Sequence, residues 1–168
     1  IVYNDAALDQ AVEGVVNGIF FNQGHVCCAG SRLLLQEDIH DEFINKLEKR
    51  MQTLRVGNPL DKNTDIGAIN SKEQLEKITS LVNEGVNDGG ELFQIECDLP
   101  SSGYWFRPSL FTNVQPSYNI AREEIFGPVL TTLTFRTPEE AVEIANNTEY
   151  GLSAGVWTCL LYTSDAAD

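Results

Sequence analysis

Two different spacings of apolar residues follow one another along this chain, and this alternation constrains the fold more than any other feature. Residues 6–20 carry apolar side chains three or four positions apart, as one face of a helix requires. Residues 33–35 and 129–135 are instead short apolar or β-branched runs, typical of buried strands. The two patterns interleave as far as residue 158. We therefore predict an α/β fold with a mostly parallel sheet flanked by helices.

Local start and stop signals set the expected limits of these elements. Four helices are expected between Asn4-Asp5 and Phe20, Asp38 and Gly57-Asn58-Pro59, Ser71 and Asn87, and Thr137 and Asn146-Asn147. Extended segments are expected at 1–3, 33–35, 91–96, 104–114 with a break at Pro108, 129–135 and 152–158. The helix that begins at Thr137 has the strongest signal, because proline follows the cap residue at the first helical position.

Size and charge narrow the class of protein. The 168 residues are 42% hydrophobic, enough for one core and one domain. A formal charge of −14 argues against nucleic-acid and anionic-membrane partners, because phosphate binding requires a basic surface. No apolar run approaches the roughly 18 residues that span a bilayer, so we expect no membrane partner. Because the chain opens on Ile1-Val2-Tyr3 without a methionine, we expect it to be part of a longer protein.

The cysteines indicate the compartment and a candidate nucleophile. Four cysteines, at 27, 28, 97 and 159, are too few for a disulfide scaffold, so we expect a reducing, cytoplasmic location. Residues 20–32, FFNQGHVCCAGSR, place two of them in a loop of small residues. A thiol attacks a carbonyl as the thiolate, which favours a partly open loop rich in backbone N–H donors. The alternative is that Cys27 and Cys28 are small buried hydrophobic residues, which is common for free cysteine.

The order of residues in this loop favours the nucleophile. FNQGHVCCAGSR resembles the active-site segment of the aldehyde dehydrogenase superfamily, in which F-x-N-x-G-Q/E-x-C ends on the reactive cysteine. By that pattern Cys27, and not Cys28, is the catalytic residue. His25 departs from the family, which usually has glutamine or glutamate there.

Residues 121–129, AREEIFGPV, form a second segment of interest. Taken singly, glutamates are usually solvated and Phe126 is an ordinary core aromatic. The sequence EEIFGPV, however, resembles the family segment that meets the nicotinamide half of the cofactor. The resemblance implies that Glu124 accepts hydrogen bonds from the ribose diol, that Phe126 lies on the nicotinamide side, and that Gly127-Pro128 fixes the turn.

Further matches cover almost the whole chain. They are GNPLD at 57–61, GYWFRP at 103–108 and YGLSA at 150–154, while LPS at 99–101 and DIGA at 65–68 look most like the family 16 branch. Residues 1–158 are therefore expected to form a partial aldehyde dehydrogenase catalytic domain with that domain's α/β fold. Residues 159–168 are expected to be a divergent tail foreign to the family.

The resemblance implies a reaction in which NAD or NADP oxidises an aldehyde to a carboxylic acid. Cys27 would form a thiohemiacetal and then a thioester, which water hydrolyses. The family's general-base glutamate and oxyanion asparagine are expected outside this chain. No G-x-G-x-x-G or P-loop occurs, so the cofactor would be bound mainly by an absent domain. We thus expect the chain alone to be inactive and its parent protein to be a homo-oligomer.

Three other functions compete with this interpretation. A non-catalytic scaffold with the same fold is the main alternative, because some family 16 members lack the nucleophile. A cysteine hydrolase would need His25 or His40, but His25 is only two residues from Cys27 and acidic residues surround His40. The H-x-C-C arrangement lacks the spacing of a zinc-ligand pair, so we expect no metal.

Overall fold

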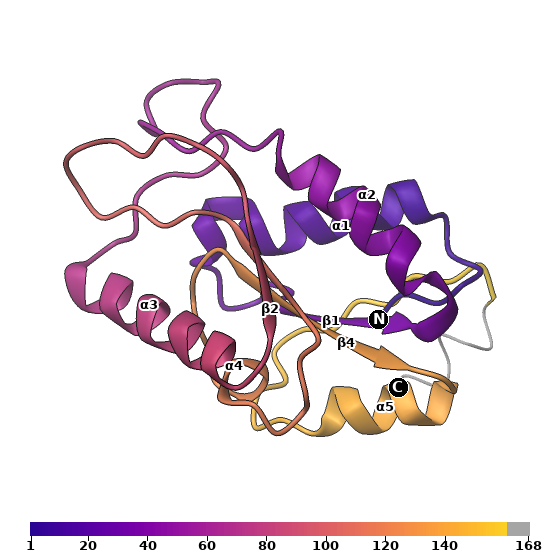
Figure 1. The fold of residues 1–168 in the computed structure, drawn as a ribbon. Coiled ribbons are helices and arrows are strands. Elements are labelled where there is room, and N and C mark those ends of the chain that lie inside the picture. The colour runs from indigo at the N-terminus through magenta and orange to yellow at the C-terminus, as the bar shows by residue number, and fades with distance from the viewer. Residues whose placement is uncertain (161–168) are drawn as a thin grey trace.

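The computed structural model describes residues 1–160 and shows a four-stranded sheet covered by helices (Figure 1). The strands are β1 (Arg32–Gln36), β2 (Glu91–Gln94), β3 (Ser109–Thr112) and β4 (Val129–Phe135), in the order β1-β4-β3-β2. β1, β4 and β3 are parallel, and β2 is an antiparallel edge strand. The predicted α/β fold with a mostly parallel sheet is confirmed.

In residues 1–160, five α-helices and two short 3₁₀ helices accompany the strands. They are α1 (Leu8–Phe20), the 3₁₀ helix η1 (Phe21–Gly24), the 3₁₀ helix η2 (Glu37–Ile39), α2 (His40–Met51), α3 (Lys72–Asn87), α4 (Asn119–Arg122) and α5 (Pro138–Asn146). Within residues 1–160, no helix combines the length and the apolar composition that a membrane crossing needs.

The sheet separates two hydrophobic cores, as the alternation of side chains along a strand requires. Leu33 and Leu35 of β1 belong to the core that α1 and α2 cover, whereas Leu34 belongs to the core that α3, α4 and α5 cover. Burial on both faces explains why β1 is a continuous leucine run, as in other parallel sheets covered on both sides. All three leucines are at most 3% exposed.

The predicted cap at Thr137 is confirmed, and Ser71, at the predicted start of the third helix, also acts as a cap. The Ser71 hydroxyl accepts a hydrogen bond from the amide of Gln74 at 3.1 Å, which starts α3. The Thr137 hydroxyl accepts one from the amide of Glu140 at 3.3 Å, and Pro138 is the first residue of α5. Both side chains satisfy amide groups that have no partner inside their helix.

The other two predicted caps are wrong, because these side chains bind elsewhere. The Asn4 side-chain amide donates to the Asp38 carboxylate at 2.8 Å, and the Asp5 carboxylate accepts from the Thr158 hydroxyl at 2.9 Å. α1 begins only at Leu8, and Asp38 lies inside η2. Residues that resemble caps locally are thus used to join segments far apart in the sequence.

Several predicted boundaries also differ. The second helix ends at Met51 instead of reaching Gly57. Residues 152–155 are exposed and form no strand; only Trp157 pairs, through an isolated bridge to Val2, which is itself bridged to Leu35 of β1. An alternating pattern forms a strand only where a neighbouring strand continues beside it. Here Val2 gives the 152–158 segment a single bridge, at Trp157. Residues 161–168 of the predicted tail lie outside the described residues.

Candidate active site

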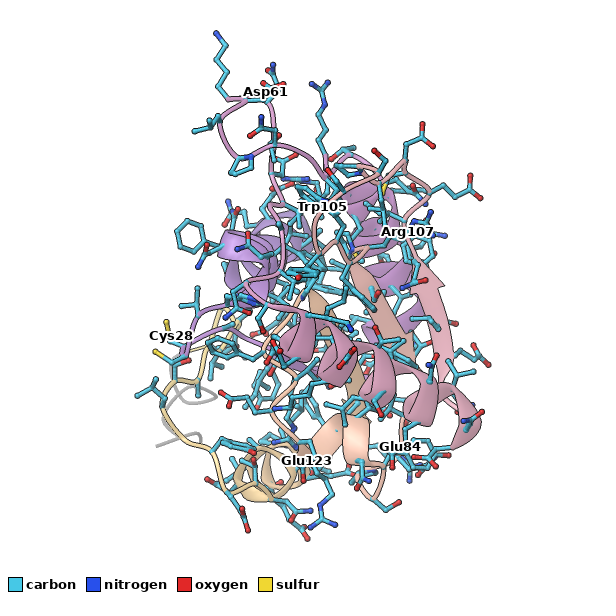
Figure 2. The ribbon with its side chains drawn as sticks, turned by 90° about the vertical axis from the view of Figure 1, so that its left-hand side faces the viewer. Cys28, Asp61, Glu84, Trp105, Arg107 and Glu123 are labelled. Carbon is cyan, nitrogen blue, oxygen red and sulfur yellow. The ribbon has the colours of Figure 1, made fainter. Side chains whose placement is uncertain are left out.

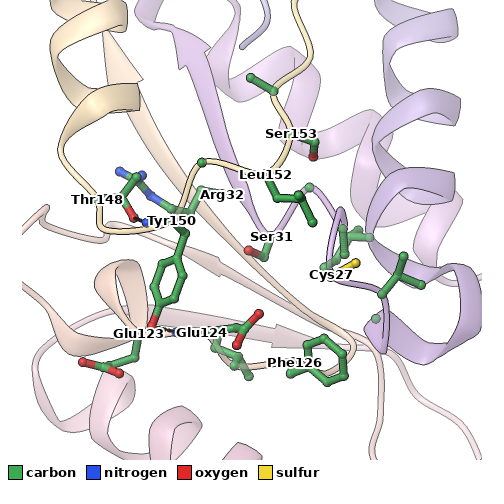
Figure 3. Close-up of a pocket in the computed structure, with 18 of the residues that line it drawn as sticks. Cys27, Ser31, Arg32, Glu123, Glu124, Phe126, Thr148, Tyr150, Leu152 and Ser153 are labelled. Carbon is green, nitrogen blue, oxygen red and sulfur yellow. Dashed lines mark hydrogen bonds between the residues drawn. The ribbon is translucent and has the colours of Figure 1, made fainter.

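One pocket of about 360 Å³ lies where three loops meet: the loop after α1, the turn before β4 and the segment after α5. Cys27 comes from the first loop, Glu124 and Phe126 from the second, and Tyr150 and Leu152 from the third (Figure 3). The three site residues predicted from the sequence therefore line the same pocket, although their roles remain predictions.

Cys27 and Cys28 occupy the centre of a tight turn closed by a 3.0 Å hydrogen bond from the Ala29 amide to the Val26 carbonyl. Both are free and exposed, and Figure 2 shows Cys28 at the edge of the molecule. The alternative that they are small buried hydrophobic residues is therefore wrong. A thiol in this position is accessible to a small molecule that enters the pocket.

The base of this loop is fixed on both sides. The Gly30 amide donates to the Gly18 carbonyl of α1 at 3.1 Å. The Ser153 hydroxyl donates to the Cys28 carbonyl at 3.0 Å, which ties the loop to the segment after α5. Among the hydrogen bonds of residues 1–160, none uses the amide N–H of Cys27. The loop thus presents an ordered thiol together with a free backbone donor.

The backbone before the cysteines is left-handed at three successive residues. Asn22, Gln23 and Gly24 have φ values of 50°, 49° and 74°. Asparagine tolerates this region because its short polar side chain bonds locally, and the Asn22 amide here donates to the His25 carbonyl at 3.1 Å. Gln23 is held by the Gly67 amide, which donates to its side-chain oxygen at 3.2 Å. These contacts compensate for an unfavourable backbone conformation.

Gly24 lies directly against the backbone of Gly127 in the turn before β4. A side chain at Gly24 would collide with the Gly127 carbonyl, and one at Gly127 would collide with Ile78 of α3. This close approach brings the cysteine loop onto the turn that carries Glu124 and Phe126.

That turn is held by α3. The Gln74 side-chain amide donates to the carbonyls of Ile125 and Phe126, at 2.8 and 3.1 Å. Phe126 has a φ of 53°, which is uncommon for a residue that is not glycine. The Glu124 amide donates to the Tyr150 hydroxyl at 3.4 Å. Glu123 and Glu124 both line the pocket, and Figure 3 shows their carboxylates on opposite sides of Tyr150, with Glu124 on the side of Phe126.

His25 does not pair with a cysteine. Its ring stacks on Phe126, with ring centroids 5.4 Å apart and planes 20° apart, and its Nε2 accepts from the Asn70 amide at 3.3 Å. Burial lowers the pKa of His25 below its usual value of 6.5. His40 bonds Asp41 on α2. Neither histidine lines the pocket, so the geometry gives a cysteine hydrolase no base.

One residue that holds these loops together, Gln74, lies outside the sequence motifs. Gln74 follows the Ser71 cap by three positions, and that spacing marks it as part of a helix start but not as a ligand for a distant turn. Arg32 also lines the pocket and donates to the Ile144 carbonyl at 3.0 Å, while burial lowers the pKa of its guanidinium. In the part of the chain that the structure describes, no group of His, Cys, Asp and Glu is arranged to hold a metal ion.

Alanine at Gly24 should displace the cysteine loop. The substitution adds a clash with the Gly127 carbonyl to a backbone conformation that costs about 1–3 kcal/mol for a residue with a side chain. We expect a loss of at least this order in the free energy of unfolding, measured with urea. The matched control is Gly30→Ala, because a side chain added at Gly30 would meet no atom within 4 Å. Equal stability of the two variants would contradict the role given to the Gly24–Gly127 contact.

Comparison with known proteins identifies relatives over nearly the whole chain. Human mitochondrial aldehyde dehydrogenase is 44% identical over 158 residues, which cover 94% of this chain and 31% of that protein. Betaine aldehyde dehydrogenase of Mesorhizobium japonicum is 41% identical over 165 residues and is covered to 33%. A crystal structure of an NAD-dependent aldehyde dehydrogenase from Sinorhizobium meliloti superposes with a TM-score of 0.95, at 44% identity. That match covers 99% of this chain and 33% of the other.

These matches agree with the family resemblance found in the sequence. The chain spans about a third of the length of the relatives that it matches. The family described as "Aldehyde dehydrogenase family" matches residues 1–165. With the mostly parallel sheet and the relatives at more than 40% identity, this match shows that the chain belongs to the aldehyde dehydrogenase family.

Proposed function

We propose that this chain supplies the nucleophile and the nicotinamide-side contacts of an NAD(P)-dependent aldehyde dehydrogenase, which oxidises an aldehyde to a carboxylic acid. The observation that carries the proposal is the meeting of Cys27, Glu124 and Phe126 around one pocket. Two segments remote in sequence bring together a reactive thiol, a carboxylate and an aromatic ring. The names of the relatives support the same chemistry, because one is described as an NAD-dependent aldehyde dehydrogenase and another is an indole-3-acetaldehyde dehydrogenase in complex with NAD+.

Cys27 performs the covalent chemistry. Its thiolate sulfur attacks the aldehyde carbon, a C–S bond forms, and the carbonyl oxygen becomes an oxyanion. The unused amide N–H of Cys27 can donate a hydrogen bond to that oxygen, which stabilises the charge where it develops. Collapse of the oxyanion expels hydride from the carbon and leaves a thioester on the sulfur. Water then cleaves the thioester to the carboxylic acid and restores the thiolate.

Glu124 and Phe126 fit the nicotinamide half of a dinucleotide. When bound, the cofactor supplies the hydride acceptor. No hydrogen bond or ion pair within residues 1–160 occupies the exposed Glu124 carboxylate, so both of its oxygens can accept from a ribose diol. Phe126 offers a partly exposed ring beside it. We propose that three further groups belong to segments that this chain does not contain. They are the residues that bind the cofactor's pyrophosphate, the base that activates water for thioester hydrolysis, and the second donor to the oxyanion.

The other expectations from the sequence stay proposals. The four free thiols fit a reducing compartment, and we propose a cytoplasmic location. We also propose that the parent protein is a homo-oligomer without nucleic-acid or membrane partners, and that the chain alone is inactive. No observation in the structure favours the scaffold function over catalysis.

Replacement of Cys27 should abolish oxidation. In the full-length protein that carries this chain, Cys27→Ala removes the attacking sulfur. NADH absorbance at 340 nm should therefore not appear with an aldehyde and NAD, however long the reaction runs. Cys28→Ala is the matched control, because its side chain is one residue further along the same turn, and it should retain turnover. Retained activity in Cys27→Ala would overturn the assignment and leave the scaffold function.

Neutralisation of Glu124 should weaken cofactor binding. Glu124→Gln replaces hydrogen bonds to a charged acceptor by weaker ones, so the KM for NAD should rise about tenfold or more. Glu123→Gln is the control, because Glu123 also lines the pocket but its carboxylate lies on the other side of Tyr150 from Glu124, and its KM for NAD should not change. An unchanged KM in Glu124→Gln, or equal changes in both variants, would exclude Glu124 as the ribose ligand.

A further inference from the structure

We propose that His25 is a positioning residue that holds the Cys27 loop in register with the Phe126 turn, and that it does so only as a neutral imidazole. The inference deepens the proposed function, on which it rests, because it concerns the alignment of the thiol with the cofactor side of the pocket. It is carried by the contacts of the His25 ring, which joins three segments remote in sequence.

The first contact is with the turn. The His25 and Phe126 rings are nearly parallel, at 20°, with centroids 5.4 Å apart, in the range of stacked aromatic pairs. His25 is two residues before Cys27, and Phe126 is two residues after Glu124. The stack therefore adds a further contact between the two functional segments, one residue from the Gly24–Gly127 contact on each side.

The second contact sets the tautomer. The Asn70 backbone N–H can only donate, and it points to His25 Nε2 at 3.3 Å. Nε2 must therefore carry the lone pair, and the proton of the neutral ring lies on Nδ1. Nδ1 is buried and forms no hydrogen bond with the described residues. A second proton would sit on Nε2, facing the Asn70 N–H, so protonation breaks this hydrogen bond.

The surroundings of the ring also disfavour the charged form. Burial lowers the pKa of His25, and the Asn70 side chain and the Phe126 carbonyl oppose that shift only in part. A cation over the Phe126 face would gain some attraction, but the direction of the shift shows that burial prevails. By their place in the chain, the ionisable groups on the segments that the His25 ring joins are Cys27 on the same loop, Glu124 on the turn, and Lys72 and Glu73 at the start of α3. None of them forms a hydrogen bond or an ion pair with His25.

The pH dependence follows from the sign of this shift. The folded-state pKa lies below 6.5, so only well above pH 6.5 do the folded and unfolded chains bind the same number of protons at this residue. As the pH falls below 6.5, the unfolded chain takes up the proton first, and the His25 contacts lose stability. The contacts that align the Cys27 loop with the Phe126 turn should therefore weaken below pH 6.5.

The experiment compares His25→Ala, His25→Gln and His40→Gln in the full-length protein. His25→Gln keeps a side-chain acceptor for the Asn70 amide but has no ionisation in this range. His40→Gln is the matched control, because His40 bonds only its neighbour Asp41 on α2. The first measurement is hydrogen exchange at the Asn70 amide by mass spectrometry, without cofactor or aldehyde, with rates corrected for the intrinsic effect of pH.

At pH 7.5, the protection factor of the Asn70 amide should fall about fivefold in His25→Ala, as expected for the loss of one ordinary hydrogen bond. In His25→Gln it should return to the wild-type value. Wild type and His40→Gln should lose protection below pH 6.5, whereas His25→Gln should not. The proposal would be overturned if His25→Ala left the protection of the Asn70 amide unchanged. It would also be overturned if His25→Gln still lost this protection below pH 6.5.

The second measurement is turnover with unlabelled aldehyde and with aldehyde deuterated at the carbonyl carbon. Misplacement of the thiol relative to the cofactor should lower kcat of His25→Ala about tenfold, raise the deuterium isotope effect and leave the KM for NAD nearly unchanged. A fall in kcat without a larger isotope effect would mean a merely structural role and would contradict the proposal. Should His25→Ala fail to fold, the pH profiles of His25→Gln against His40→Gln decide the question.

The two measurements separate the two claims. If the protein oxidises no aldehyde, but hydrogen exchange at Asn70 still responds to the His25 substitutions, the proposed function is refuted and the pH-dependent contact is not. An active dehydrogenase in which neither exchange nor isotope effect responds to His25 would refute only the inference about His25.

Discussion

The close approach of Gly24 to the Gly127 carbonyl is the contact on which the candidate site depends. It requires glycine at the end of a left-handed segment, because a side chain at Gly24 would collide with the Gly127 carbonyl, and Ile78 of α3 leaves no room for a side chain at Gly127. Through it, the loop that follows α1 lies against the turn that precedes β4. Without this contact, Cys27 and Phe126 would belong to two separate surface loops.

Rigid elements position these two loops. α1 receives the Gly30 amide, α3 holds the turn through Gln74, and the segment after α5 binds the Cys28 carbonyl through Ser153. The strained residues Gln23 and Phe126 lie at this junction, where several hydrogen bonds fix a backbone conformation that local preference does not favour. Strain of this kind is common in binding and catalytic sites, which agrees with the proposed function.

The sequence predicts those features whose physical cause is local. The leucine run at 33–35, the cap at Thr137, and the β-branched run at 129–135 each predict the element that the structure shows. Motifs point to Cys27, Glu124 and Phe126, and the fold brings these residues together. The predicted caps at Asn4 and Asp38 are wrong because the two side chains bind each other across 34 residues. For the same reason, no spacing could reveal that Gln74 and His25 hold Phe126 from two sides.

The central claim, that Cys27 forms the covalent intermediate, is tested most directly by trapping that intermediate. The full-length protein would be mixed with NAD and an aldehyde, quenched in acid within one turnover, and digested for mass spectrometry. We expect the mass of the acyl group to appear on Cys27 only when NAD is present, because the thioester forms after hydride leaves. An acyl group on Cys28 instead, or none on the peptide that contains both cysteines, would contradict the claim.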